Sequence, residues 1–199
     1  GDASVYALDA SNGKVLWRTA LGTPPDTFLW DSPTYYAGQL YIGVSSFGAC
    51  PEVQGKMVQL NAVTGRITHT FPIVPNGCIG GGVWSSPTID QPTGTLYFGT
   101  GNEGTCSSAE SYASAIIKLK ASDLSLIAYW HLAPTQRVPD NDFGATTTLF
   151  KATIKGVAQN MVGVINKNGV FYAFKRNGIS NGPLWSAQVA SGGNCPQCG

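Results

Sequence analysis

The segment VYALDASNGKVLW at Val5–Trp17 decides the fold, because it recurs along the chain. The second copy reads MVQLNAVTGRITH at Met57–His69, and a looser third copy reads IIKLKASDLSLI at Ile116–Ile127. The last copy is GVFYAFKRNG at Gly169–Gly178. Equivalent positions follow one another at intervals of about 52–59 residues, and a fixed period of this size indicates a repeat architecture.

A second repeated block lies between these copies. The sequence WDSPT at Trp30–Thr34 matches WSSPT at Trp84–Thr88 and, more weakly, FGATT at Phe143–Thr147. Each block precedes a strand-like run, and these runs are Gln39–Gly43, Thr95–Gly99 and Asn160–Ile165. Every period therefore holds four short strand-like runs separated by Gly, Asn or Pro turns. This pattern predicts one four-stranded antiparallel blade per period, in an all-β propeller.

The composition supports an all-β chain and excludes several other classes. The 199 residues include 25 Gly, 8 Tyr, 8 Phe and 5 Trp, and only 12% are charged. Helical bundles and coiled coils need long stretches of Ala, Glu, Lys and Leu, which are lacking here. The net charge of +1 and the lack of a basic block argue against a nucleic-acid partner. No apolar run is long enough for a transmembrane helix.

The repeat boundaries predict a single propeller segment over residues 1–199. Residues 1–20 supply a partial blade, and residues 25–75, 80–132 and 140–188 supply three full blades. Residues 189–199 begin the next loop. Three and a half blades do not close a ring, since propellers use about four to eight. We therefore expect part of a larger propeller; two chains that complete one another, or an ordinary β-sandwich, are the alternatives.

The repeated blocks resemble the pyrroloquinoline-quinone (PQQ) type β-propeller repeat over essentially the whole chain. Within that group, GVWSSPTID at Gly82–Asp90, followed by LYFGTGN at Leu96–Asn102, is similar to the quinoprotein alcohol dehydrogenases. The variant that oxidises polyvinyl alcohol is the most similar. The resemblance implies a ring of about eight blades, of which this chain holds about three and a half.

The resemblance also implies roles for particular residues. Trp84 matches the tryptophan on which the quinone stacks, since an indole face offers a planar cofactor a large contact area. Asn102 matches a calcium ligand, because calcium prefers oxygen donors. Lys167 matches the cation that faces the quinone oxygen and stabilises negative charge there. For Trp84 a purely structural role is the alternative, because Trp30 takes its place one blade earlier. The alternatives are a turn residue for Asn102 and a solvated hairpin lysine for Lys167.

The segment Pro139–Gly144 resembles the family stretch that supplies the catalytic base. Asp140 is the first candidate for removing the hydroxyl proton of the substrate and Asp142 the second, and an Asx turn is the structural alternative. Cys50 stands where the family carries a calcium-binding glutamate, and a thiol is a poor calcium ligand. Glu52 could replace that glutamate only if the loop is rebuilt. The resemblance thus implies PQQ and calcium as cofactors, with the calcium site weakened.

Five cysteines in a chain of this composition favour an oxidising compartment, so we expect a periplasmic or extracellular protein. Nothing at the N-terminus, GDASVY, has the form of a targeting segment. We expect a disulfide between Cys50 and Cys78, which flank the outer strands of one blade. Cys195 and Cys198 then bridge locally, or one of them pairs with Cys106.

Two functions follow as hypotheses. The first is a segment of a PQQ- and calcium-dependent dehydrogenase that oxidises alcohols, including polymeric ones, with further blades or a second copy completing the ring. The second is a cofactor-free extracellular propeller that serves as a scaffold, adhesion or binding module. The enzyme hypothesis requires Trp84, Asn102, Asp140 and Lys167 to converge. The scaffold hypothesis expects Trp84 to be buried against neighbouring blades in the same way as Trp30.

Overall fold

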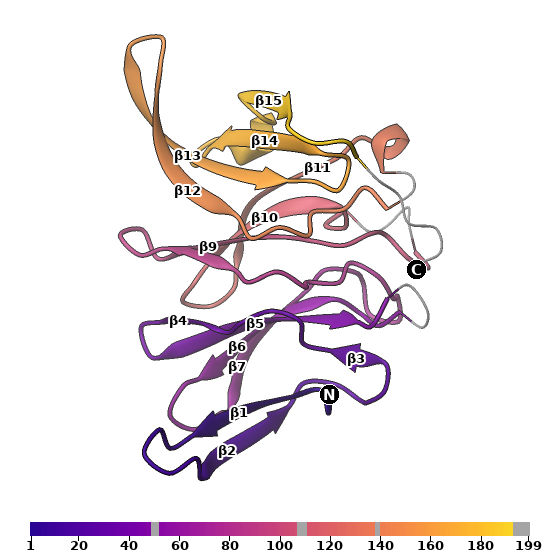
Figure 1. Cartoon of the computed structure of the whole chain (residues 1–199), viewed down its shortest axis with the longest axis vertical. Helices are drawn as coiled ribbons and strands as arrows, with labels where there is room; N and C mark the ends of the chain where they lie inside the picture. Colours follow the sequence, from indigo (N-terminus) through magenta and orange to yellow (C-terminus); the bar gives the residue numbers. More distant parts are fainter. Residues whose placement is uncertain (49–51, 107–110, 138–139, 193–199) are drawn as a thin grey trace.

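A computed structural model describes residues 1–48, 52–106, 111–137 and 140–192 of the chain. Figure 1 shows that the strands form twisted sheets that follow one another along the long axis, from the N-terminal hairpin to the C-terminal sheet. Apart from two short 3-10 turns, η2 (Pro134–Gln136) and η3 (Ile179–Asn181), the described elements are strands. No helix in these ranges is long and apolar enough to span a membrane.

The strands group into one hairpin and three larger antiparallel sheets, as the repeats predict. The hairpin contains β1 (Ser4–Leu8) and β2 (Val15–Ala20). The second sheet contains β3 (Thr27–Phe28), β4 (Thr34–Tyr36), β5 (Gln39–Ser46), β6 (Lys56–Asn61) and β7 (Ile67–Pro72). The third contains β8 (Thr88–Asp90), β9 (Thr95–Gly99), β10 (Ala115–Lys120) and β11 (Leu126–His131). The fourth contains β12 (Thr148–Ile154), β13 (Val157–Ile165), β14 (Val170–Lys175) and β15 (Trp185–Gln188).

The second sheet departs slightly from four strands per period. Its first strand is interrupted, so that β4 pairs with the start of β5, where Thr34 faces Tyr41, and β3 pairs with the end, where Thr27 faces Ser46. The hairpin and the three sheets match the predicted half blade and three blades of an all-β propeller.

The segment that recurs along the chain forms the two outer strands of a blade and the turn between them. In the first copy, the Asp9 carboxylate accepts a hydrogen bond from the Ser11 backbone N–H, and Gly13 takes a φ of +74°. In the second copy, Asn61 binds the Thr64 N–H and Gly65 has a φ of +70°. The positive φ at both glycines explains why each turn ends in Gly.

The Trp-x-Ser-Pro-Thr block joins each sheet to the next. The Thr34 hydroxyl donates to the Pro87 carbonyl at 2.7 Å, and the Thr88 hydroxyl donates to the Thr147 carbonyl at 2.6 Å. Each threonine therefore bonds the same block in the following repeat. This contact explains why the block recurs, since it sets the spacing of adjacent sheets.

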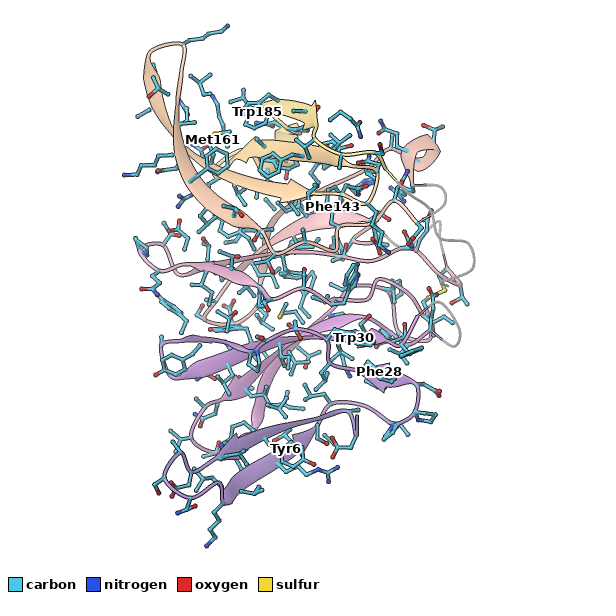
Figure 2. All side chains as sticks on the ribbon, viewed as in Figure 1. Tyr6, Phe28, Trp30, Phe143, Met161 and Trp185 are labelled. Carbon is cyan, nitrogen blue, oxygen red and sulfur yellow. A yellow bond between two sulfur atoms is a disulfide. The ribbon has the colours of Figure 1, made fainter. Side chains whose placement is uncertain are left out.

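Apolar side chains fill the spaces between sheets. Between the second and third sheets lie residues such as Met57, Leu96 and Ile117, which are essentially inaccessible to solvent. Between the third and fourth lie Phe143 and Phe174, which are equally buried. Figure 2 places Phe143 among these upper strands. The core is thus divided into layers, one for each pair of adjacent sheets.

Three predictions about particular residues are wrong. Cys78 forms its disulfide with Cys106 and not with Cys50, because the loop after β7 lies beside the loop after β9. The pairing of Cys106 with Cys195 or Cys198 is wrong for the same reason, since Cys106 is bonded to Cys78. Cys50, Cys195 and Cys198 themselves lie outside the described residues. Trp30 is not buried between blades: it is 50% exposed and stacks on Phe28 with ring centroids 5.2 Å apart. Figure 2 labels both residues, which lie close to each other.

Candidate functional site

The residues singled out from the sequence lie at one end of the third and fourth sheets. Trp84 precedes β8 and Asn102 follows β9, so both are at the same end of that antiparallel pair. Asp140 and Asp142 lie in the connection from β11 to β12, and Lys167 lies in the turn between β13 and β14. Strand direction alone therefore places all five on one end of two adjacent blades.

Lys167 is the centre of this group. Its Nζ donates to Asp140 Oδ1 at 2.6 Å and lies 3.1 Å from Asp142 Oδ1. The same Nζ lies over the Trp84 ring, 5.0 Å from the centroid, a distance at which a cation and an aromatic face attract each other. One ammonium group thus joins two carboxylates and one indole.

The backbone fixes the position of Lys167. Its N–H donates to the Asp142 carbonyl at 3.1 Å, and the neighbouring Asn166 side chain donates to the Asn141 carbonyl at 3.0 Å. The turn from β13 to β14 is therefore bonded directly to the segment that carries the two aspartates. Asp140 has a φ of +65°, a conformation that is uncommon for residues other than glycine and is held here by these surroundings.

Only one of the two polar side-chain atoms of Asn102 has a hydrogen-bond partner. Its Nδ2 donates to Asp140 Oδ1 at 3.1 Å, while its Oδ1 is buried without a hydrogen-bond partner. Its backbone carbonyl accepts a hydrogen bond from the Gly81 N–H at 2.7 Å, which anchors the loop. A buried carbonyl-type oxygen without a partner is uncommon, and it suits a cation that prefers hard oxygen donors.

Burial and charge oppose each other at Asp142. Its side chain is only 5% exposed, and this burial raises its pKa to about 6, although the charge of Lys167 and a hydrogen bond from Trp84 lower it in part. Burial alone would lower the pKa of Lys167, but the charge of Asp142 and the bonds to both carboxylates outweigh it and raise the pKa. Lys167 is therefore a fixed cation at physiological pH.

Trp84 is half-buried and packs closely on Gly144, the second residue of the block in the next repeat. A Cβ added at Gly144 would lie 1.9 Å from Cη2 of Trp84. The surroundings of Trp30 differ from those of Trp84, which contacts Lys167. The Nε1 of Trp30 donates to the Ser46 carbonyl at 2.9 Å, and its ring neighbours are Phe28 and Phe47. The two tryptophans thus have different surroundings despite equivalent sequence positions.

The Gly144→Ala variant tests this packing. The added methyl group has to displace the indole, so we expect a loss of about 1–3 kcal/mol in unfolding free energy and a changed near-UV circular dichroism signal. Gly178→Ala is the matched control, since a Cβ there comes no closer than 3.2 Å to another atom. An unchanged near-UV spectrum in Gly144→Ala would contradict the close contact with Trp84.

Glu52 lies near the Asn102 loop, and a Cβ at Gly104 would come 2.7 Å from its Oε2. Cys50, the residue that replaces the expected glutamate, lies outside the described residues. Within residues 1–48, 52–106, 111–137 and 140–192, no three His, Cys, Asp or Glu side chains gather into a metal-binding group. Asn102 is thus the described oxygen donor that best fits a cation.

Sequence reasoning missed one ion pair beside the site. Arg137 Nη1 lies 3.2 Å from Glu103 Oε2, and Glu103 directly follows Asn102. Neither residue belongs to a repeat block, and they are far apart in the sequence, so no local pattern connects them.

Comparisons with known proteins identify relatives of the chain. A polyvinylalcohol dehydrogenase of a Pseudomonas species is 33% identical over 51% of the chain, and one of a Sphingopyxis strain is 26% identical over 95%. The quinohemoprotein alcohol dehydrogenase ADH IIB of Pseudomonas putida is 27% identical over 94%. The homologues of this chain are polyvinyl-alcohol and quinohemoprotein alcohol dehydrogenases. No known protein-family profile matches it.

The chain spans only 20–35% of the length of these dehydrogenase relatives. Among solved structures, the quinohemoprotein alcohol dehydrogenase of Comamonas testosteroni aligns with a TM-score of 0.81 at 22% identity, over 94% of this chain and 32% of that one. A europium-containing methanol dehydrogenase aligns with a TM-score of 0.77 at 18% identity, over 94% of this chain and 38% of that one. At these identities the likeness concerns the fold, which is that of a quinoprotein propeller.

Proposed function

We propose that this chain forms part of a quinoprotein dehydrogenase that oxidises alcohols. The observation that supports it most strongly is the convergence of Trp84, Asn102, Asp140, Asp142 and Lys167, which come from separate positions in two repeats. The homologues, which are alcohol dehydrogenases, support the same reaction class. Residues 1–199 are then one propeller segment of a larger ring.

In this proposal, Asp140 takes the proton from the substrate hydroxyl. Its side chain is 33% exposed, whereas that of Asp142 is almost fully buried, so Asp140 is the carboxylate that a substrate can reach. A general base has to come within hydrogen-bond distance of the proton it removes. Asp142 then holds Lys167 in place, and the proton moves from the alcohol oxygen to a carboxylate oxygen of Asp140.

The Trp84 indole and the Asn102 Oδ1 are the groups that would hold the cofactors. PQQ, when bound, supplies a hydride acceptor, and calcium supplies a positive charge that polarises an oxygen. The unpartnered Asn102 Oδ1 fits a hard cation, and the fixed positive charge of Lys167 stabilises an oxygen that becomes negative nearby. Trp84 and Asn102 would thus bind and orient the cofactors, and Lys167 would neutralise the negative charge.

The substrate class is an alcohol, and the polyvinylalcohol dehydrogenases among the relatives favour a polymeric one. We also propose a periplasmic or extracellular location, which the Cys78–Cys106 disulfide supports because disulfides persist in oxidising compartments. The alternative, a cofactor-free scaffold, gives no reason for a buried, unpartnered Asn102 oxygen next to a charged cluster.

A calorimetric titration with PQQ in the presence of calcium tests the proposal. The titration uses the full-length protein that contains this chain. We expect saturable, calcium-dependent binding that falls at least tenfold in Trp84→Ala and in Asn102→Ala. Trp30→Ala is the control, because Trp30 has the same place in the preceding repeat and should leave binding unchanged. Binding that is absent, or equal in all four proteins, would favour the scaffold.

A further inference from the structure

The loop that carries Asn102 is held firmly on one side. The Gly101 N–H donates to the Gly82 carbonyl at 2.7 Å, the Gly81 N–H donates to the Asn102 carbonyl, and the disulfide from Cys106 ties the end of the loop to Cys78. All of these contacts lead back to the connection between β7 and β8. They fix the loop to the segment that carries Trp84.

Toward the fourth sheet, side chains make the contacts. Asn102 bonds Asp140, and Glu103 pairs with Arg137, whose side chain is only 8% exposed. Arg137 is held in turn, since its Nε donates to the Leu132 carbonyl at 2.8 Å and its Nη2 contacts His131 Nδ1. The guanidinium thus joins the end of β11 to the residue that follows Asn102.

We infer that Arg137 and Glu103 are positioning residues for the candidate site. They set the distance between the loop that carries Asn102 and the segment that carries Asp140. This inference rests on the proposed function. Two loops from different parts of the chain have to present Asn102 Oδ1 and the Asp140 carboxylate to one place. A planar guanidinium with several directed N–H donors fixes both loops at once, which a flexible ammonium group does less well.

The molecule offers a matched control at the opposite end of the same two sheets. Arg176 Nη1 lies 2.9 Å from Asp90 Oδ2, and both side chains are largely buried. Asp90 ends β8, whereas Trp84 precedes it, so this pair lies away from the candidate site. Loss of either arginine leaves a carboxylate without its ion-pair partner, that of Asp90 largely buried and that of Glu103 28% exposed, and both losses destabilise the fold. Only Arg137 should affect the site.

The test measures calcium and terbium affinity, by tryptophan fluorescence and sensitised terbium luminescence, in the full-length protein. We expect Arg137→Met to weaken cation binding at least tenfold, Arg137→Lys to weaken it less, and Arg176→Met to leave it unchanged. The double variant Glu103→Gln with Arg137→Met removes the unpaired charge, so it should regain stability but not affinity. Affinity that recovers together with stability, or that falls equally in Arg176→Met, would overturn the inference.

A second readout needs no cation. The Asn102 side-chain amide donates to Asp140, so its NMR signal and its hydrogen-exchange protection report the relation of the two loops. We expect Arg137→Met to shift the signal and reduce the protection, and Arg176→Met to change neither. If the wild-type protein binds no cation but Arg137→Met still disturbs this amide, the cation part of the proposed function fails and the positioning role stands. An undisturbed amide overturns the positioning role.

Discussion

Replacing Lys167 with methionine is expected to lower the unfolding free energy by about 3 kcal/mol at pH 8, because a buried carboxylate loses its partner. The loss should be small at pH 4.5. Asp142 has a pKa of about 6, raised by burial, so it is mostly protonated in acid and needs no cation there. Without Lys167 the pKa of Asp142 should rise further. Urea unfolding of both proteins at the two pH values measures the difference.

Lys118→Met is the control for this variant. Lys118 also lies over an aromatic ring, that of Tyr97 at 5.5 Å, but its Nζ donates to the Arg176 carbonyl and no carboxylate ion pair is described for it. Its replacement should cost a similar amount of stability at both pH values. Equal losses at pH 4.5 and pH 8 in Lys167→Met would show that Lys167 does not compensate the charge of Asp142.

The opposite result is expected for Asp31→Asn, which should stabilise the protein at pH 8. Burial raises the pKa of Asp31 to about 7, although the Gly43 N–H, 2.9 Å from Oδ2, lowers it in part. The other carboxylate oxygen is buried without a partner. The amide avoids ionisation, so we expect a gain of about 2–4 kcal/mol at pH 8, from about 1.4 kcal/mol per pKa unit.

The sign of this pH dependence follows from the protonation states. Well below the pKa of 3.8 that an aspartate has in the unfolded chain, Asp31 is protonated in both the folded and the unfolded chain and contributes no penalty. As the pH rises toward 7, the unfolded chain releases this proton first, so the wild-type protein loses stability that Asp31→Asn keeps. Asp90→Asn, which breaks the ion pair with Arg176, should instead destabilise the protein. Chemical denaturation at pH 4 and pH 8 distinguishes these outcomes.

The sequence predicted the sheets well because each repeat carries its own signals. The Gly13 and Gly65 turns and the Thr34 and Thr88 contacts act within one repeat or between neighbours, so they recur at a fixed period. The Cys78–Cys106 disulfide joins the connection between the second and third sheets to the β9–β10 connection inside the third sheet. The spacing of cysteines around one blade does not contain that information, and the predicted pairing with Cys50 was therefore wrong.

The candidate site was predicted only in part. Family resemblance indicated Trp84, Asn102, Asp140, Asp142 and Lys167, and the structure brings them together. The resemblance did not indicate that Lys167 bridges both aspartates. That contact depends on how the β13–β14 turn packs on the preceding connection, which is a tertiary relation.

The location of the site limits which repeats can be duplicated or inserted without disrupting it. Trp84 and Asn102 belong to one repeat, and Asp140, Asp142 and Lys167 belong to the next. Copying a single repeat within the gene would lengthen the array but would reproduce only half of the cluster. Inserting a repeat between the two would separate the halves. Changes in blade number elsewhere would leave the cluster intact, so the constraint falls on this neighbouring pair of repeats.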